Sequence, residues 1–263
     1  CPGWPMQGRR CIIAGNGIGD RVMTWSLLAH DPATGALAVA VTTCALAVGA
    51  SCPFLRAGVG AVSTQSITNR YLGPAVLDAM ARGLPPADAI ESALAGDAGR
   101  GIRQVHAVDR HGRAAAHTGA HCVEWAGDAR AKGVSVAGNM LAGPAVAADA
   151  LARFEAAEPS ALPFPERLLA AMDAAQAAGG DKRGLQSAAL LLVTTEDFPD
   201  INIRVDDHPA PLDELRRLLA VWRRDREPGL RTAPRKADPS GLVDLDAIEA
   251  GWRARGLELR FRR

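Results

Sequence analysis

Aromatic side chains make up only 4% of this 263-residue sequence. Proteins that bind single-stranded nucleic acid stack the bases on aromatic rings, so this scarcity argues against that function. Net charge is also small, +1 at pH 7, and residues 23–208 carry fourteen Lys and Arg against nineteen Asp and Glu. A slightly acidic central region lacks the basic stripe that neutralises phosphates. We therefore expect no nucleic-acid partner.

Signals for secretion and membrane insertion are also missing. The N-terminal residues 1–22 contain no apolar run of signal-peptide length. The uncharged stretch 35–55 is nominally long enough to span a bilayer, but its branched apolar residues alternate with alanine, which is typical of strands. The five cysteines are irregularly spaced and indicate no disulfide framework, which favours a reducing compartment. We therefore expect a cytoplasmic protein with no membrane partner.

Familiar catalytic and cofactor motifs are absent as well. The sequence has no phosphate loop, no Cys-x-x-Cys pair and no Gly-x-Ser-x-Gly elbow, and the glycines at 15–19 follow no convincing strand. His117, His121 and Cys122 are residue types that bind zinc. Gly119 between the two histidines favours a turn, so we interpret them as solvated strand-end residues. We expect no cofactor and no metal, and a metal-dependent hydrolase is the weakest of three functional hypotheses.

The hydrophobic pattern predicts hairpins that alternate with pairs of helices. The predicted strands are 24–30, 36–43, 58–64, 103–108, 113–118, 121–125, 133–139, 186–194 and 201–205, and helices are expected to start near Pro74, Pro86, Pro144, Pro165 and Pro209. Strands that come as hairpins favour antiparallel sheets covered by helices. We therefore predict an α+β fold, a four-layer αββα sandwich of two antiparallel sheets flanked by helices.

The same pattern divides the chain into three parts. Residues 1–22 form an N-terminal extension and residues 23–224 a single domain. Residues 225–263 begin with a stretch rich in Pro, Gly and charge that is typical of a linker, and end in a short basic segment with room for one helix.

The pair Met23-Thr24 is the most informative position for chemistry. If Met23 is the biosynthetic start, its removal leaves Thr24 with a free α-amine at the beginning of the first predicted strand. A terminal threonine is an activated nucleophile, because its own amine, with a pKa of about 7.7–8.0, takes the hydroxyl proton, usually through a water. This chemistry needs no His or Asp partner. The plainer interpretation is that Thr24 is a β-branched strand residue.

Residues from Met23 to about Arg217 resemble a known family. The matching stretches are TWS (24–26), HDPATG (30–35), AGVGAVSTQ (57–65), Asn69 with YLG (71–73), VAGN (136–139), AAGGD (177–181), RGLQS (183–187) and RVDDHP (204–209). They are similar to domain of unknown function 1028, a bacterial family placed in the N-terminal nucleophile (Ntn) hydrolase superfamily. The resemblance implies an αββα fold, an amide-hydrolysing ancestry and a nucleophile at Thr24.

The sequence departs from that family in two ways. Residues 1–22, a propeptide or a mis-called start, precede Met23; if they persist, the Thr24 nitrogen is an amide and cannot act as a base. The end of the second predicted strand, 41–44, holds no lysine, whereas proteasome-like relatives use one to depress the nucleophile's pKa. Cys1 is a rival nucleophile that we set aside, because the Pro-Gly-Trp-Pro after it cannot form a strand.

Five polar residues are candidates for the oxyanion or substrate-binding site. An oxyanion hole needs donors already oriented where negative charge develops, and amide side chains supply them at Gln65, Asn69 and Asn139. Arg70 can pair with a substrate carboxylate. Gln186 begins a buried strand, where its polar group needs a partner. The alternative for all of them is satisfaction of nearby backbone groups.

The leading hypothesis is an Ntn-type amidohydrolase that cleaves a small linear amide through Thr24 and an acyl-enzyme. The main alternative is a non-catalytic αββα scaffold that binds a ligand or a partner. A homodimer is a further expectation, because the exposed ends of layered sandwiches often pair.

Overall fold

The computed structural model describes residues 24–157 and 159–262. The predicted N-terminal extension, 1–22, lies outside the described residues. The chain divides into two compact units, one ending at Arg217 and one running from Leu218 to Arg263. Helix α5 (Pro211–Asp225) contains this division.

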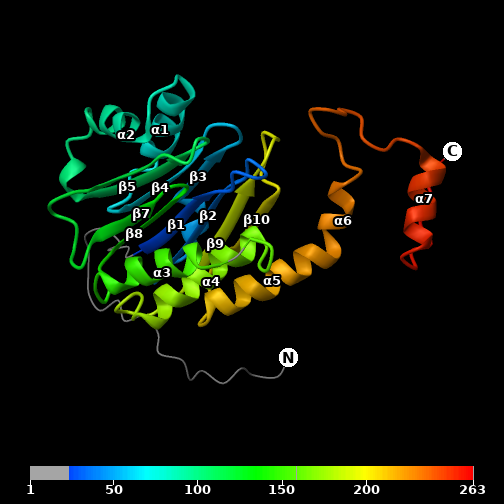
Figure 1. Cartoon of the computed structure of the whole chain (residues 1–263). Helices are drawn as coiled ribbons and strands as arrows, with labels where there is room; N and C mark the ends of the chain where they lie inside the picture. The colour runs from blue at the N-terminus through cyan, green and yellow to red at the C-terminus, as the bar shows by residue number, and fades with distance from the viewer. Residues whose placement is uncertain (1–23, 158, 263) are drawn as a thin grey trace. The chain divides into compact units, whose positions relative to one another are not determined.

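The larger of two sheets has β1 near its centre (Figure 1). Six described strands form it in the order β10-β9-β2-β1-β8-β7, and all neighbours are antiparallel. The strands are β1 (Thr24–His30), β2 (Leu37–Thr43), β7 (Gly127–Ala131), β8 (Val134–Asn139), β9 (Ser187–Val193) and β10 (Ile201–Val205). Because β1 lies between β2 and β8, its backbone pairs on both sides.

The smaller sheet has four described strands in the order β3-β4-β5-β6, again antiparallel. They are β3 (Pro53–Arg56), β4 (Gly60–Ser66), β5 (Arg103–Asp109) and β6 (Ala114–Thr118). Strands β4 and β5 contact β1 and β8 of the larger sheet, so the two sheets lie face to face.

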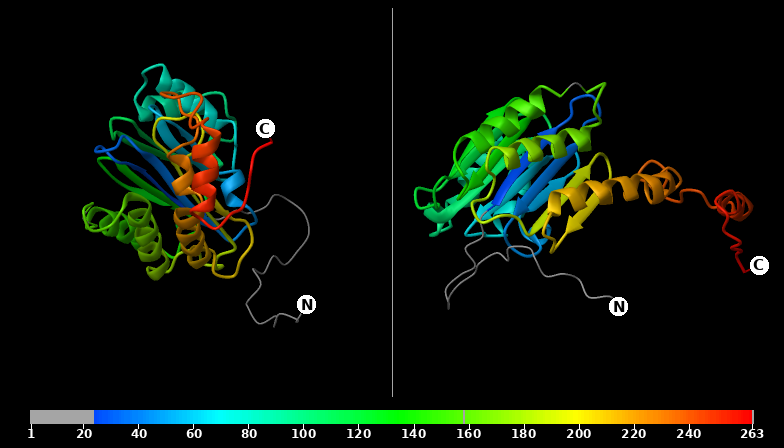
Figure 2. Two further views of the ribbon diagram at one scale, coloured as in Figure 1. Left: turned by 90° about the vertical axis from the view of Figure 1, so that its right-hand side faces the viewer. Right: turned by 90° about the horizontal axis from the view of Figure 1, so that it is seen from below.

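Helices cover the outer face of each sheet (Figure 2). Helices α1 (Leu72–Ala81) and α2 (Pro86–Leu94) pack on the smaller sheet, and α3 (Ala145–Glu155) and α4 (Phe164–Ala177) pack on the larger one. The fold is therefore an α+β, four-layer αββα sandwich, as the hairpin pattern predicts. None of the described helices combines the length and apolar composition needed to cross a membrane.

The layer between the two sheets has an apolar region and a polar region. Val39, Val41 and Leu191 of the larger sheet pack in one buried cluster with Ala61 and Val108 of the smaller sheet. The inward positions of β1, β4, β5 and β8 instead carry buried polar side chains, namely Ser26, Ser63, Gln65, Gln104, His106, Ser135 and Asn139. Successive strand residues face opposite sides, so Val62 and Val105 on the same strands pack toward α1 and α2.

One predicted strand is wrong. Residues 121–125 form turns and bends, and the strand that pairs with β8 is β7, which begins at Gly127. The pattern misleads because β7 lies at a sheet edge and none of its residues is fully buried, so it lacks the apolar alternation that marks β1 or β2.

The second unit contains two described helices, α6 (Glu227–Leu230) and α7 (Leu245–Arg253). The Asp244 carboxylate caps α7 by accepting from the backbone N–H of Asp246 at 3.0 Å and of Ala247 at 3.1 Å. The rings of Trp252 and Phe261 lie 4.9 Å apart, centroid to centroid. Helix α7 lies within 242–263, the segment in which the sequence has room for one helix.

Candidate functional site

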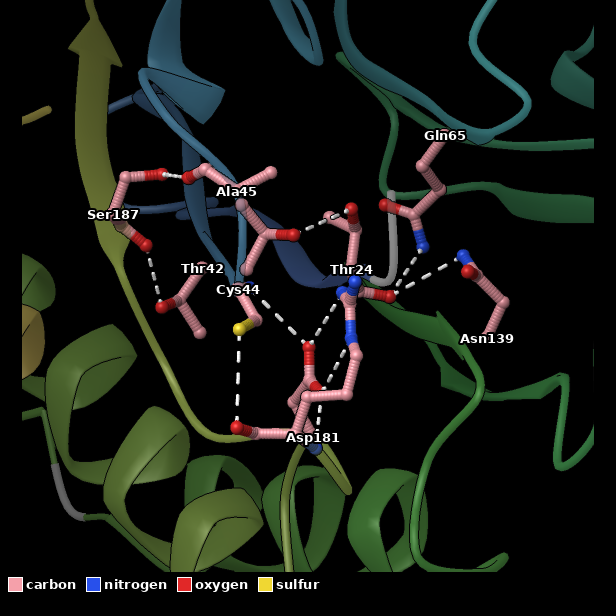
Figure 3. A network of polar contacts seen from close by, with 10 residues as sticks. Thr24, Thr42, Cys44, Ala45, Gln65, Asn139, Asp181 and Ser187 are labelled. Atoms are coloured by element: carbon pink, nitrogen blue, oxygen red, sulfur yellow. Dashed lines mark hydrogen bonds and ion pairs between the residues drawn. The ribbon is translucent and has the colours of Figure 1, made fainter. Parts of the chain in front are cut away.

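Thr24 begins β1 and lies between the ends of two neighbouring strands. Its register partners are Thr43, the last residue of β2, and Asn139, the last residue of β8. Thr24 is fully buried. Figure 3 shows it with the amides of Gln65 and Asn139 on one side and the β2 end, with Cys44, on the other.

The contacts of Thr24 are long for hydrogen bonds. Its Oγ1 donates to Thr43 Oγ1 at 3.4 Å. Its carbonyl oxygen accepts from Gln65 Nε2 and from Asn139 Nδ2, each at 3.4 Å. Oxygen–oxygen hydrogen bonds are usually about 2.7–2.8 Å long. The hydrogen bond between the Thr24 and Thr43 hydroxyls is therefore weak.

Gln104 on β5 holds the two amides that face Thr24. Its Oε1 accepts from Gln65 Nε2 at 2.9 Å and from Asn139 Nδ2 at 3.1 Å, and its Nε2 donates to Gly138 O at 2.8 Å. Sequence reasoning missed this residue. The only sequence signal is that Gln104 shares its strand face with His106, two residues on.

A fully buried histidine continues the network between the sheets. Ser26 Oγ donates to Gln65 Oε1 at 2.7 Å and lies 2.7 Å from His106 Nε2, while His106 Nδ1 lies 2.9 Å from Ser135 Oγ. Ser26 has one proton, and Gln65 Oε1 can only accept it. His106 Nε2 therefore carries the ring proton and donates to Ser26, and Nδ1 accepts from Ser135.

Burial controls the charge of His106. Removal from water lowers its pKa from 6.5 to about 3, and the positive charge of Arg130 acts in the same direction. His106 is thus neutral at pH 7, which suits a ring that donates at one nitrogen and accepts at the other.

This pKa predicts a loss of stability in mild acid. The folded pKa of about 3 lies below the unfolded value of 6.5, so the unfolded chain binds the proton first and stability falls as the pH drops from 6.5 toward 3. We expect protonation of His106 in the unfolded chain to lower the unfolding free energy by about 2–3 kcal/mol between pH 6.5 and 4.5. Urea unfolding at both pH values measures it.

Two variants separate this contribution from other titrating groups. His106→Gln removes the ionisable ring, so its unfolding free energy changes less between the two pH values than that of the parent. His117→Gln makes the same change at a partly exposed histidine and is the matched control for the loss of one imidazole. An equal pH dependence in the parent and His106→Gln contradicts the prediction.

Cys52 lies close to the Thr24 hydroxyl but is not poised to react. Burial raises the pKa of its thiol to about 11, against smaller opposing effects of hydrogen bonds with Ser51, Thr68 and Thr24 and of the Arg70 charge. The thiol is therefore protonated at pH 7 and is a poor nucleophile. Cys52 and Cys122 are free, whereas Cys44 is disulfide-bonded, so the expectation of reduced cysteines is wrong at Cys44.

A buried carboxylate stabilises the loop after β2. Asp181 Oδ2 accepts from the backbone N–H of Cys44 at 3.3 Å, and Arg183 donates to the same carboxylate through its backbone N–H at 2.8 Å. The Arg183 guanidinium forms an ion pair with it at 3.3 Å. The charge of Asp181 is thus compensated within the fold, next to the strand end that faces Thr24.

The other predicted site residues make their contacts elsewhere. Asn69 Nδ2 donates to Asp97 Oδ2 at 2.9 Å, Arg70 donates to Ala50 O at 3.1 Å, and Gln186 Nε2 donates to Asp207 Oδ1 at 3.0 Å. Hydrogen bonds from Arg103 and then Asn69 hold the pKa of Asp97 well below its usual range. The structure therefore brings Gln65 and Asn139 to Thr24, while Asn69, Arg70 and Gln186 have partners away from its carbonyl.

The residues considered as zinc ligands contact backbone groups. His117 Nε2 lies 3.0 Å from Arg100 O, and Cys122 Sγ donates to Arg103 O at 3.3 Å. Across the described ranges 24–157 and 159–262, no three His, Cys, Asp or Glu residues are grouped so that they could hold a metal ion.

Comparisons with known proteins cover most of the first unit. The family model described as "Family of unknown function (DUF1028)" matches residues 24–215. A crystal structure of a Silicibacter pomeroyi protein with the same family model is 33% identical, has a TM-score of 0.78, and covers 84% of this chain and 96% of that one. Anbu (ancestral beta-subunit) from Yersinia bercovieri is 10% identical with a TM-score of 0.35, covering 76% of this chain and 96% of that one. No curated protein matches the chain.

Proposed function

The chain belongs to the DUF1028 family of unknown function, and we propose that it is an amide hydrolase whose nucleophile is the Thr24 hydroxyl. The observation that supports this proposal is the place of Thr24. It is the first residue of a central strand, and its hydroxyl is weakly bonded beside Thr43 at a strand end rich in polar groups. The substrate is a small linear amide, and the bond that breaks is its C–N bond.

The reaction needs a base, and the two described side chains next to the Thr24 hydroxyl, Thr43 and Cys52, do not supply one. The Thr43 hydroxyl is a neutral group, and the Cys52 thiol holds its proton because burial raises its pKa to about 11. The free α-amine of Thr24 is the remaining base, with an ordinary pKa of about 7.7–8.0. The mechanism therefore requires cleavage of the Met23–Thr24 peptide bond.

With the amine free, the steps are those of covalent catalysis. Thr24 Oγ1 attacks the substrate carbonyl while its proton passes to the α-amine, directly or through a water. The tetrahedral intermediate collapses, the C–N bond breaks, and the leaving amine takes the proton. An ester on Thr24 Oγ1 remains, and a water molecule hydrolyses it to the free acid.

Asn139 is the better candidate for the oxyanion donor. Gln65 Nε2 has two hydrogens and three acceptors within 3.4 Å, namely Thr24 O, Gln104 Oε1 and Ala137 O. Its donors are fully used. Asn139 Nδ2 has two acceptors, and one of them, Thr24 O, lies at the long distance of 3.4 Å. That weak bond can be exchanged for a bond to a substrate oxygen at little cost.

The test compares a chain that starts at Thr24, released from a cleavable fusion, with a chain that retains Met23 and the residues before it. Both are treated with a β-lactone, which acylates nucleophilic hydroxyls, and weighed intact by mass spectrometry. We expect one acyl group on Thr24 in the first chain and none in the second. Cys52→Ser is the matched control and keeps the labelling. Equal labelling of both chains, or a label on Cys52, contradicts the proposal.

One observation favours the alternative of a non-catalytic scaffold. Thr24 has 0% exposure with the bond to Met23 intact, and its carbonyl is already bound by two amides. A scaffold predicts that the Thr24-terminated chain also resists the β-lactone and hydrolyses no member of a small-amide library.

A further inference from the structure

Two adjoining cavities lie at the end of the sandwich opposite Thr24. One has a volume of about 310 Å³ and the other about 480 Å³, and both are lined by His111 and Arg113. They are at the His30 end of β1, since a Cβ on Gly112, which lines the second cavity, would lie 3.6 Å from His30 Nδ1. Six residue steps along β1 separate His30 from Thr24, a distance of about 20 Å. The cavities are therefore distinct from the proposed catalytic site.

Backbone hydrogen bonds fix the turns that form these cavities. Gly133 N donates to Gly112 O at 2.8 Å, joining the β7–β8 turn to the β5–β6 turn. His30 N donates to Gly133 O at 2.8 Å, and Arg110 N donates to Val59 O at 3.0 Å. Gly112 and Gly133 both have positive φ, +74° and +81°, a conformation that side chains disfavour. The cavity walls are thus held together from four segments of the chain.

Basic residues are the most frequent charged residues in the lining of both cavities. They are Arg110, His111, Arg113, Arg130 and Lys132, which we call the basic pocket. The one acidic residue in either lining, Asp109, has a side chain only 4% exposed, and its carboxylate already accepts from Arg113 Nε at 2.6 Å. Its other contacts are the backbone N–H groups of His111 and Arg113, both at 2.9 Å.

The arginines of the basic pocket have internal partners but retain donors for a ligand. Arg110 donates through Nε to His111 Nε2 at 3.2 Å and through Nη1 to Gly58 O at 3.4 Å, which leaves its Nη2. Arg113 and Arg130 bind their carboxylates, Asp109 and Asp128, through Nε at 2.6 Å. A guanidinium has five N–H donors in a planar fork, so these contacts leave most of the fork for an anion. Arg110, Arg113, Arg130 and Lys132 face the carboxylates of Asp109 and Asp128, so the cations outnumber the paired carboxylates by two on a domain whose residues 23–208 are acidic in sum.

We propose that the basic pocket binds a small multivalent oxyanion, whose phosphate or paired carboxylate groups accept from Arg110, Arg113 and Lys132. Fork-shaped donors match the oxygen pairs of both groups, so the shared chemistry is that of a compact dianion. Rigid turns reduce the ordering cost of binding, because the backbone is already positioned.

The test is isothermal titration of the full chain with inorganic phosphate and, separately, with succinate, at constant ionic strength. We expect saturable binding of at least one of the two anions, with one anion bound per chain. The anion that binds more tightly shows whether the site prefers phosphate or paired carboxylate groups. Lys132→Gln removes an exposed ammonium and is expected to weaken binding about tenfold. Lys182→Gln, an equal loss of charge at the Thr24 end, is expected to leave the affinity unchanged.

A second pair of variants adds charge without removing a donor. Ala81→Glu places a carboxylate at the lining of the smaller cavity and is expected to abolish binding. Ala75→Glu makes the same change at an exposed position near the start of the same helix, α1, and is expected to retain it. The proposal is overturned if neither anion binds. It is also overturned if Lys132→Gln and Lys182→Gln weaken binding equally, or if Ala81→Glu and Ala75→Glu do.

Discussion

Replacing Thr24 with alanine in the chain that begins at residue 24 is expected to lower amide hydrolysis about 10³-fold or more, because the attacking oxygen is lost. The fold is expected to persist, since the Oγ1 contact with Thr43 is 3.4 Å long and worth about 1 kcal/mol at most. The measurement is turnover of any small amide that the parent hydrolyses, with urea unfolding of both proteins.

Two controls define the role of the hydroxyl. Thr24→Ser keeps a terminal hydroxyl and an α-amine and is expected to retain measurable turnover. Thr43→Ala removes the neighbouring hydroxyl but no atom that reacts, so its effect is expected to be far smaller than that of Thr24→Ala. Full turnover in Thr24→Ala would exclude the proposed nucleophile.

Gln104→Leu is expected to lower the unfolding free energy by about 3–5 kcal/mol, the largest effect we predict on stability. The change removes the acceptor for the amides of Gln65 and Asn139 and the donor to Gly138 O, all within a fully buried layer. Buried polar groups that lose their hydrogen-bond partners lower the stability of the folded state by their full desolvation free energy. Urea unfolding at pH 7 measures the difference.

Gln186→Leu is the matched control for this prediction. Gln186 is half-buried, and among the described residues its side chain makes one hydrogen bond, to Asp207 Oδ1 at 3.0 Å. The same substitution there is expected to cost less than about 1 kcal/mol. Equal losses at Gln104 and Gln186 would show that the network between the sheets adds nothing beyond the removal of one glutamine.

Local pattern predicts much of this fold. The first hairpin follows from alternation in 24–30 and 36–43 around a turn, and the buried strand 186–194 follows from its apolar run; both are confirmed. The edge strand β7 escapes prediction, because a strand with no fully buried residue carries no apolar signal. The four-layer arrangement can be predicted once the hairpins and helices are assigned, because the apolar face of each sheet must pack against another element.

The candidate site is harder to predict from the sequence than the fold, because it depends on which face of a strand each polar residue occupies. Polar residues that alternate with apolar ones, such as Gln104 and His106 on β5, normally indicate a solvent face. Here that face meets the second sheet and is fully buried. Gln65 and Asn139 are brought to Thr24 from strands 41 and 115 residues away along the chain. One sequence shows that these residues are polar, but only the packing of the sheets shows that they meet.

The central place of β1 also sets an order of events during protein synthesis. The β1–β2 hairpin is synthesised before the other strands of the two sheets, and a lone hairpin is marginally stable in water. Its other neighbours are made much later, because β8 (134–139) and β9 (187–193) follow the hairpin's last residue, Thr43, after 90 and 143 further residues. The polar surroundings of Thr24 therefore cannot be complete on a nascent chain shorter than about the end of β8, because Asn139 is the last residue of that strand. Any processing at Met23–Thr24 that relies on those surroundings follows translation of β8, whereas removal by an aminopeptidase at the ribosome precedes it.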